Sequence, residues 1–135
     1  MVKLTDEMKN DMKNTRLFPM ATSSGSGEPN VAPMGMVILQ DDSETIWIID
    51  NFMQKSLKNI NENGKIALYV WYPEIKGSFQ IKGTATSESS GADFEKAKIL
   101  ADKIRAGSNA KSLVKMKITE VYSVQPGPTA GKKLL

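Results

Sequence analysis

The sequence predicts a mainly β protein: an antiparallel sheet closed into a small barrel of about six strands, with helices at its rims. Two observations support this prediction. Segments rich in β-branched and aromatic residues outnumber the helical segments. Most connections between these segments are too short for the crossovers that a parallel sheet needs. Closure into a barrel would also leave few open strand edges.

The first part of the chain is expected to hold one helix and three strands. The helix covers residues 5–15, because Thr5 suits its N-cap while Asp6 and Glu7 suit its first turn. Pro19 indicates that part of the first strand lies at a sheet edge. The turn residues of 24–29 separate it from the next segment. The strands are expected at residues 16–23, 30–40 and 45–50.

The second part is expected to hold two helices and three strands. A short helix spans about 53–63, with Met53, Leu57 and Ile60 facing inward and Gly64 as its C-terminal cap. The tail, residues 126–135, is predicted to be irregular, and the sequence leaves open whether it frays or crosses to a partner subunit. The remaining elements are expected as strands at 65–71, 78–88 and 112–125 and a helix at 91–105.

Composition limits the chemistry that the side chains can perform unaided. The 135 residues suit one domain, expected to span 1–135. The chain contains no cysteine and no histidine. This excludes thiolate nucleophiles, imidazole bases and metal sites built from these ligands, and we expect no metal site. An enzyme of this composition would rely on a bound cofactor.

Charge and hydropathy argue against two classes of partner. The net charge of +3, from 18 basic and 15 acidic residues, is too small to indicate a nucleic-acid-binding surface. No apolar run approaches the roughly 18 residues typical of a transmembrane helix. The charged first sixteen residues leave no room for the apolar segment of a signal peptide. We therefore expect a cytoplasmic protein with neither a membrane nor a nucleic-acid partner.

The short helix begins with an unusual residue for that position. Gln54, Lys55 and Ser56 fall in its first turn, where the helix dipole already places partial positive charge. A phosphate bound to the free amides of that turn would make Lys55 favourable, with Ser56 and Gln54 as further donors. The alternative is a solvated helix start, since one misplaced charge costs only about 0.3–1 kcal/mol. Taken alone, the residues favour this alternative.

The stretch "NVAPMGM" raises a second question. Pro33 lacks a backbone donor, and Gly35 permits close approach to the backbone, so both are unusual inside a strand. A flat ligand lying along the strand explains both residues, and a strand edge with a bulge explains them equally well. Tyr69 and Trp71 also leave two readings open, core packing or a cover over a flat ligand.

Three blocks of the chain stand in a characteristic order and spacing: "ATSSGSGEPNVAPMGMV", "IWIIDNFMQKSLKNINENGKIALYVW" and "GSFQIKGTAT". In this order and spacing they resemble the FMN-binding split-barrel flavoproteins related to pyridoxamine 5'-phosphate oxidase. The resemblance covers roughly residues 10–126. It implies a six-stranded antiparallel Greek-key split barrel of the FMN-binding type. It also implies FMN as cofactor and a homodimer with the flavin at the subunit interface.

The resemblance also implies roles for particular residues. In this family a lysine and a serine or threonine at the start of the short helix hold the flavin phosphate. Those roles fall on Lys55 and Ser56, with Gln54 as a further donor. Trp71 and Gln80 are candidates to reach the flavin of a partner subunit. The positions expected to meet the flavin ring are Asn30, Val31, Ala32, Pro33, Met34, Asp50, Asn51 and Phe52.

The chain also departs from the family pattern. Pyridoxamine phosphate oxidases grip the substrate phosphate with further arginine and histidine residues near the C-terminus. This chain has no histidine, and Arg16 and Arg105 are expected to lie elsewhere. We therefore expect a flavin-dependent oxidoreductase that passes electrons or hydride to another small substrate or redox partner, with no catalytic residue assigned. A non-catalytic flavin-binding or storage module, a deazaflavin-using relative and an interaction domain without cofactor are the alternatives.

Overall fold

The computed structural model describes residues 1–135, and its seven strands form one antiparallel sheet in the order β2-β1-β5-β6-β7-β4-β3. The strands are β1 Phe18–Ser23, β2 Pro29–Met34, β3 Val37–Leu39, β4 Thr45–Asp50, β5 Lys65–Val70, β6 Phe79–Glu88 and β7 Ser112–Ser123. The helices are α1 Asp6–Asn14, α2 Lys55–Asn63 and α3 Ala92–Ile104.

The two edge strands of the sheet, β2 and β3, are consecutive in the chain. Only Gly35 and Met36 separate them, and two residues allow at most about 11 Å between the flanking Cα atoms. The sheet must therefore curl until its edges come together. No ladder joins β2 to β3, so the barrel is split there. The neighbouring order β4-β7-β6-β5 is a Greek key, and the predicted mainly β split barrel is confirmed.

The split falls inside the segment that the sequence predicts as one strand, residues 30–40. This segment is divided into β2 and β3, so the sheet has seven strands rather than six. Pro33 pairs with Pro19 in the β1–β2 ladder. Proline has no backbone N–H to donate, and it is tolerated here because β2 is an edge strand of the sheet. The ladder stops after Met34. The proline and the glycine therefore stand where regular pairing ends.

Alternating side chains fill the interior of the barrel. On β5, Ile66, Leu68 and Val70 are buried, as the sequence pattern predicts. A second, smaller apolar cluster lies outside the barrel, where α3 packs against β4 and β7 through Phe94 and Leu113. This cluster explains why β7 carries an apolar residue on its outward face near its start. It also fixes the end of α3 beside the end of β4.

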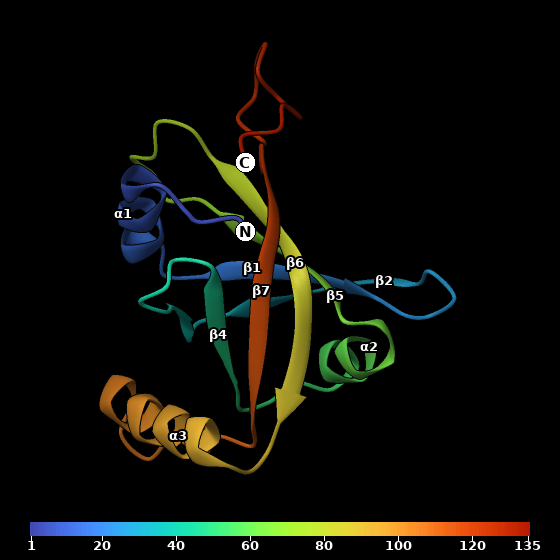
Figure 1. The fold of residues 1–135 in the computed structure, drawn as a ribbon, viewed down its shortest axis with the longest axis vertical. Coiled ribbons are helices and arrows are strands. Elements are labelled where there is room, and N and C mark those ends of the chain that lie inside the picture. Colours follow the sequence, from blue (N-terminus) through green and yellow to red (C-terminus); the bar gives the residue numbers. More distant parts are fainter.

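Helices α2 and α3 lie toward the same end of the barrel, while α1 and the C-terminal tail lie toward the other (Figure 1). Helix α2 is held to β1 by polar contacts, since Asn59 donates to Thr22 at 3.0 Å and Asn63 donates to the backbone of Ser23 at 2.8 Å. Gly64 ends it with a φ of 69°, which confirms the predicted cap. None of the three helices is long and apolar enough to cross a membrane.

The C-terminal tail folds back on its own chain rather than extending away from it. The backbone N–H of Leu134 donates to Val121 at 2.8 Å, and the N–H of Ser123 donates to Lys132 at 2.8 Å. Leu135 packs against the main core cluster. The tail therefore covers the last part of β7 within its own chain, at the end of the barrel away from α2 (Figure 1).

Candidate functional site

A cavity of about 530 Å³ lies where β2, the end of β4 and the start of α2 meet. Its volume falls within the range of roughly 300–1,000 Å³ that is typical of small-molecule and cofactor sites. All the predicted site residues line it except Trp71 and Gln80. The sequence did not assign five further residues of its wall: Gly35, Met36, Ile49, Met53 and Arg105.

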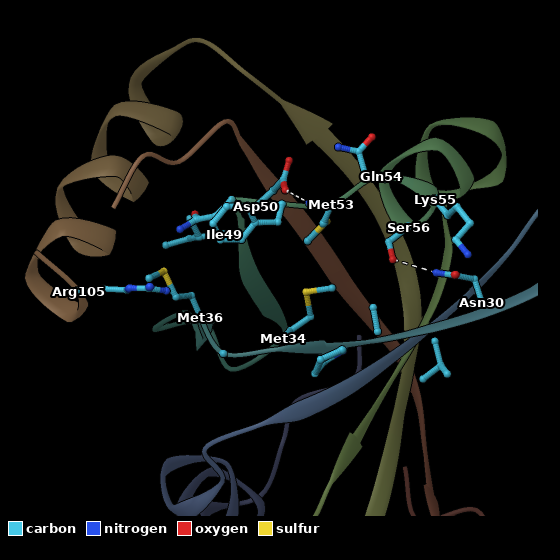
Figure 2. A pocket seen from close by; sticks show the side chains of 16 residues that line it. Asn30, Met34, Met36, Ile49, Asp50, Met53, Gln54, Lys55, Ser56 and Arg105 are labelled. Atoms are coloured by element: carbon cyan, nitrogen blue, oxygen red, sulfur yellow. Dashed lines mark hydrogen bonds between the residues drawn. The ribbon is translucent and has the colours of Figure 1, made fainter. Parts of the chain in front are cut away.

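The N-terminus of α2 leaves its backbone donors open at one end of this cavity. Gln54 holds the N-cap position, but its side chain makes no capping hydrogen bond, and the first turn contains no acidic residue. The Gln54 amide points away from Ser56 and Asn30 (Figure 2). The first N–H groups of a helix have no acceptor within the helix. An anion at this position would therefore meet unpaired donors.

Ser56 is oriented by a side chain from β2. It is only 3% exposed, and its Oγ accepts a hydrogen bond from Asn30 Nδ2 at 3.0 Å (Figure 2). Because the amide supplies the hydrogen of this contact, the hydroxyl hydrogen of Ser56 is free to donate to a ligand. The neighbouring Lys55 is exposed and forms no ion pair within the chain. This end of the cavity offers hydrogen-bond donors and one positive charge.

Asp50 shapes the loop between β4 and α2. It is fully buried, and its carboxylate accepts hydrogen bonds from the Met53 backbone N–H at 2.6 Å and from the Ser112 hydroxyl at 2.7 Å. Its own carbonyl accepts from the Lys111 N–H at 2.8 Å. These contacts tie the loop to the start of β7. Asp50 therefore contributes to the cavity through the loop that it holds in place.

Asn51, the next residue in this loop, contains the single buried side-chain polar atom of the molecule that lacks a partner. Its Nδ2 donates to the Ser108 Oγ at 2.8 Å, while its Oδ1 is buried without a donor. Such an atom costs about 1–3 kcal/mol when it stays unpaired. A donor from a molecule bound in the cavity would pair with this oxygen.

The middle of the cavity is apolar. Four apolar side chains lie between Lys55 and Arg105 in Figure 2: Met34, Met36, Ile49 and Met53. Phe52, in the loop before α2, also lines the cavity although its side chain is 80% exposed. A flat apolar surface beside an exposed aromatic ring suits a planar, partly aromatic ligand. Methionines can adjust their shape to such a ligand because they have several rotatable bonds.

Arg105 lies in the cavity wall, a position that the sequence did not assign to it. It follows α3 directly, and its side chain extends toward Met36, at the end of the cavity opposite Lys55 (Figure 2). The physical reason is a long-range contact, since packing of α3 on β4 brings the α3–β7 loop beside the β4–α2 loop. No local pattern around Arg105 in the sequence signals this placement.

Trp71 and Gln80 lie outside this cavity, on the outer face of β5 and β6. Trp71 is 49% exposed and lines a separate hollow with Leu17 and Tyr72. Gln80 lines a neighbouring hollow together with Tyr69. Within one chain, neither residue belongs to the site around Lys55. Their expected contact with the flavin of a second subunit remains a prediction.

The sequence model of a family described as pyridoxamine 5'-phosphate oxidase matches residues 4–125 of this chain. The chain is also 40% identical over 133 residues to the uncharacterized protein MJ0282 of Methanocaldococcus jannaschii, an alignment that covers 97% of this chain and 87% of the relative.

Solved structures share the fold of this chain. HupZ of Group A Streptococcus is 30% identical, with a TM-score of 0.81 and coverage of 95% of this chain and 99% of that chain. Two more distant structures share the fold. An FMN-binding protein of Syntrophomonas wolfei has 18% identity, a TM-score of 0.75 and coverage of 87% and 83%. HutZ of Vibrio cholerae, a heme storage protein, has 12% identity, a TM-score of 0.67 and coverage of 90% and 95%.

Proposed function

The chain belongs to the pyridoxamine 5'-phosphate oxidase family, and from this premise we propose that it binds FMN in the cavity at the start of α2. The observation that carries the proposal is the uncapped N-terminus of α2 with Lys55 and Ser56 at one end of that cavity. Lys55 would neutralise charge on the flavin phosphate. The Ser56 hydroxyl and the first backbone N–H groups would donate hydrogen bonds to it.

The remaining wall fits the other parts of FMN. The apolar middle, with Met34 and Met53, suits the ring system. Asn51 has a buried carbonyl oxygen without a donor, and the pyrimidine part of a flavin carries one N–H group that could satisfy it. The remaining expected contacts, along Asn30–Met34 and at Asp50 and Phe52, come from residues that line the same cavity. The donor set and the orphaned oxygen thus both support a flavin.

As an oxidoreductase, the protein would pass electrons or hydride to a small substrate or redox partner. Bound FMN would supply the redox chemistry, because the chain has no histidine or cysteine to perform it. The chain's own residues would fix the phosphate, position the ring and limit water in the apolar part of the cavity. Asn30 would keep Ser56 turned toward the phosphate through their 3.0 Å hydrogen bond.

A second copy of the chain is proposed to cover the outer face of β1, β2 and β5. Val31 is 69% exposed there. It pairs with Ala21, which in turn pairs with Ala67. These residues line one hollow together with Tyr69 and Gln80. A homodimer formed through this face would bury the apolar residues and bring Trp71 and Gln80 toward the other subunit's flavin.

The proposal is tested by titrating the purified protein with FMN, riboflavin and hemin, followed by absorbance and fluorescence. We expect FMN to bind more tightly than riboflavin, because only FMN carries the phosphate. Equal affinity for the two flavins would contradict the phosphate site. Binding of hemin but not FMN would reject the cofactor assignment. Heme binding is disfavoured by the lack of histidine and cysteine, two common axial ligands.

Turnover separates the remaining alternatives. Oxidation of a reduced nicotinamide by the FMN-loaded protein, with an artificial electron acceptor, supports an oxidoreductase. A stable FMN complex without turnover toward nicotinamide or ferredoxin-type donors supports a flavin storage module. Preference for a deazaflavin over FMN would assign the chain to a deazaflavin-using relative. Size-exclusion chromatography with light scattering measures whether the protein is a dimer.

A further inference from the structure

We propose that Arg105 forms a second anion site in the cavity and that the molecule bound there together with the flavin carries a carboxylate. This inference rests on the proposed function, since it concerns the part of the cavity that the flavin phosphate leaves free. Lys55 and Arg105 lie at opposite ends of the cavity wall (Figure 2). A ligand phosphate held by Lys55 therefore leaves the arginine without an anion.

The guanidinium of Arg105 has no partner within the chain. The five ion pairs of the molecule involve other residues. The only acidic residue of the cavity wall is Asp50, and both of its carboxylate oxygens already accept hydrogen bonds. Arg105 is exposed and presents a positive charge that no side chain of the chain pairs with, beside an apolar surface that includes Met36 and Ile49.

The backbone that carries Arg105 is held firmly against the cavity. Its N–H donates to Ala101 at 2.8 Å, and its carbonyl accepts from Ser108 at 3.0 Å. The Ser108 hydroxyl accepts from Asn51 at 2.8 Å, which joins the loop after α3 to the loop before α2. Gly107, with a φ of 78°, permits the turn between them. The side chain therefore starts from a fixed position at the cavity wall.

A carboxylate fits this position better than a phosphate does. Arg105 is the C-cap residue of α3, where the helix dipole places partial negative charge that disfavours a dianion more strongly than a singly charged anion. No second cation lines this end of the cavity, since Lys55 and Arg105 are its only basic residues. The planar guanidinium fork matches a singly charged carboxylate through two parallel hydrogen bonds. The neighbouring methionines and Ile49 suit an apolar body attached to that carboxylate.

Benzoate and benzamide are suitable probes, because they share a shape and differ in charge. Binding to the FMN-loaded and to the FMN-free protein is followed by amide chemical shifts in NMR spectra. We expect benzoate to bind more tightly than benzamide and to shift the amides of residues 49–53 and 105–108. Arg105→Gln should weaken benzoate about tenfold and leave benzamide unchanged. Arg105→Lys, which keeps the charge but loses the fork, should fall between.

Lys103→Gln is the matched control, because it removes an equal charge from the last turn of the same helix without touching the cavity. It should leave benzoate binding unchanged. FMN affinity should stay within about twofold of the wild type in Lys103→Gln, while the ratio of FMN to riboflavin affinity in the wild type tests the proposed function separately. Arginine-dependent benzoate binding to a protein that fails to bind FMN would therefore reject the proposed function and keep the second anion site.

Three outcomes would overturn the inference. One such outcome is equal affinity for benzoate and benzamide. Another is a benzoate affinity that Arg105→Gln does not change. Either result would show that the Arg105 side chain is solvated and binds no carboxylate. A lowered FMN midpoint potential in Arg105→Gln with unchanged benzoate affinity would assign the charge to the reduced flavin itself rather than to a second molecule. The potential is measured on the FMN-loaded protein by spectroelectrochemistry.

Discussion

The N-termini of α2 and α3 solve the same electrostatic problem in opposite ways. Helix α3 has Asp93 and Glu95 in its first turn, and Asp93 pairs with Lys115 of β7 at 2.5 Å. Helix α2 has no acidic residue in its first turn and begins with Lys55. Neither helix start has a side-chain cap, so the difference between them is that the first turn of α3 carries negative charge from the chain itself. The first turn of α2 lacks such a charge, and we propose that it binds an anion in the cavity that most of the predicted site residues line.

This difference distinguishes a helix start that stabilises the fold from one that we propose binds a ligand. The contacts around Lys115 serve the fold, because they join α3 to the sheet next to the apolar cluster around Phe94. The residues around Lys55 contribute donors that the fold does not use. Substitutions in the two places should therefore act on different quantities, one on the free energy of unfolding and the other on ligand affinity.

The largest effect is expected from Lys55→Glu. It should weaken FMN at least about a hundredfold, since it replaces an attractive contact with the phosphate by a repulsive one. The FMN-free protein should gain about 0.3–1 kcal/mol of stability, because a negative charge suits a helix N-terminus. FMN titration and chemical denaturation measure the two effects. Lys58→Glu, on the exposed face of the same helix and outside the cavity, is the control.

A loss of stability in Lys55→Glu without a change in FMN affinity would remove the distinction between the two helix starts.

A smaller effect on affinity is expected from Ser56→Ala. Loss of one hydrogen bond to a charged phosphate should weaken FMN about tenfold, which corresponds to about 1.4 kcal/mol. Riboflavin affinity should stay unchanged, because riboflavin lacks the phosphate. Fluorescence titration with both flavins makes the comparison. A similar loss for riboflavin would instead indicate that Ser56 supports the shape of the cavity through its contact with Asn30.

Lys115→Met tests the other helix start. Its ammonium contacts Glu88 at 2.8 Å and Asp93 at 2.5 Å, and the side chain is partly exposed. We expect a loss of about 1 kcal/mol in the free energy of unfolding, because solvent screens such a pair. FMN affinity should be unchanged. Urea denaturation measures the first quantity, and any large loss of FMN binding would contradict the separation of roles.

The smallest effect is the pH dependence of that ion pair. The hydrogen bond from Lys115 lowers the pKa of Asp93 below its usual 3.8. The stability that ionised Asp93 contributes is therefore fully present above pH 3.8 and is lost as the pH falls through the lowered pKa. Hydrogen bonds to Asp93 and Glu88 raise the pKa of Lys115 above 10.5, so its contribution is lost only as the pH rises through that raised value.

The stability difference between wild type and Lys115→Met should therefore be constant between about pH 5 and pH 9 and shrink outside that window. Denaturation midpoints measured across this range give the comparison. A difference that varies steadily between pH 5 and pH 9 would show that other groups dominate the effect of the substitution.

Local patterns in the sequence predicted most of the elements. Thr5 caps α1 through its contact with the Met8 N–H at 3.2 Å, as the residue type at that position indicates. The alternation along β5 and the glycine after α2 also predicted the observed structure. The predicted strand at 30–40 was wrong in one respect, since it divides at Gly35 and Met36. The break lies where the chain passes from one edge of the sheet to the other, and this position is a property of the whole barrel.

Local sequence was sufficient to predict the mainly β class, a helix that begins at Lys55 without an acidic first turn, and the absence of histidine and cysteine chemistry. These features depend on periodicity, residue type and composition, which can be read along the chain. The positions of Arg105 in the cavity wall and of Trp71 outside the cavity became clear from the three-dimensional fold. Both placements depend on how distant elements pack, as α3 does on β4, and no local pattern encodes such a contact.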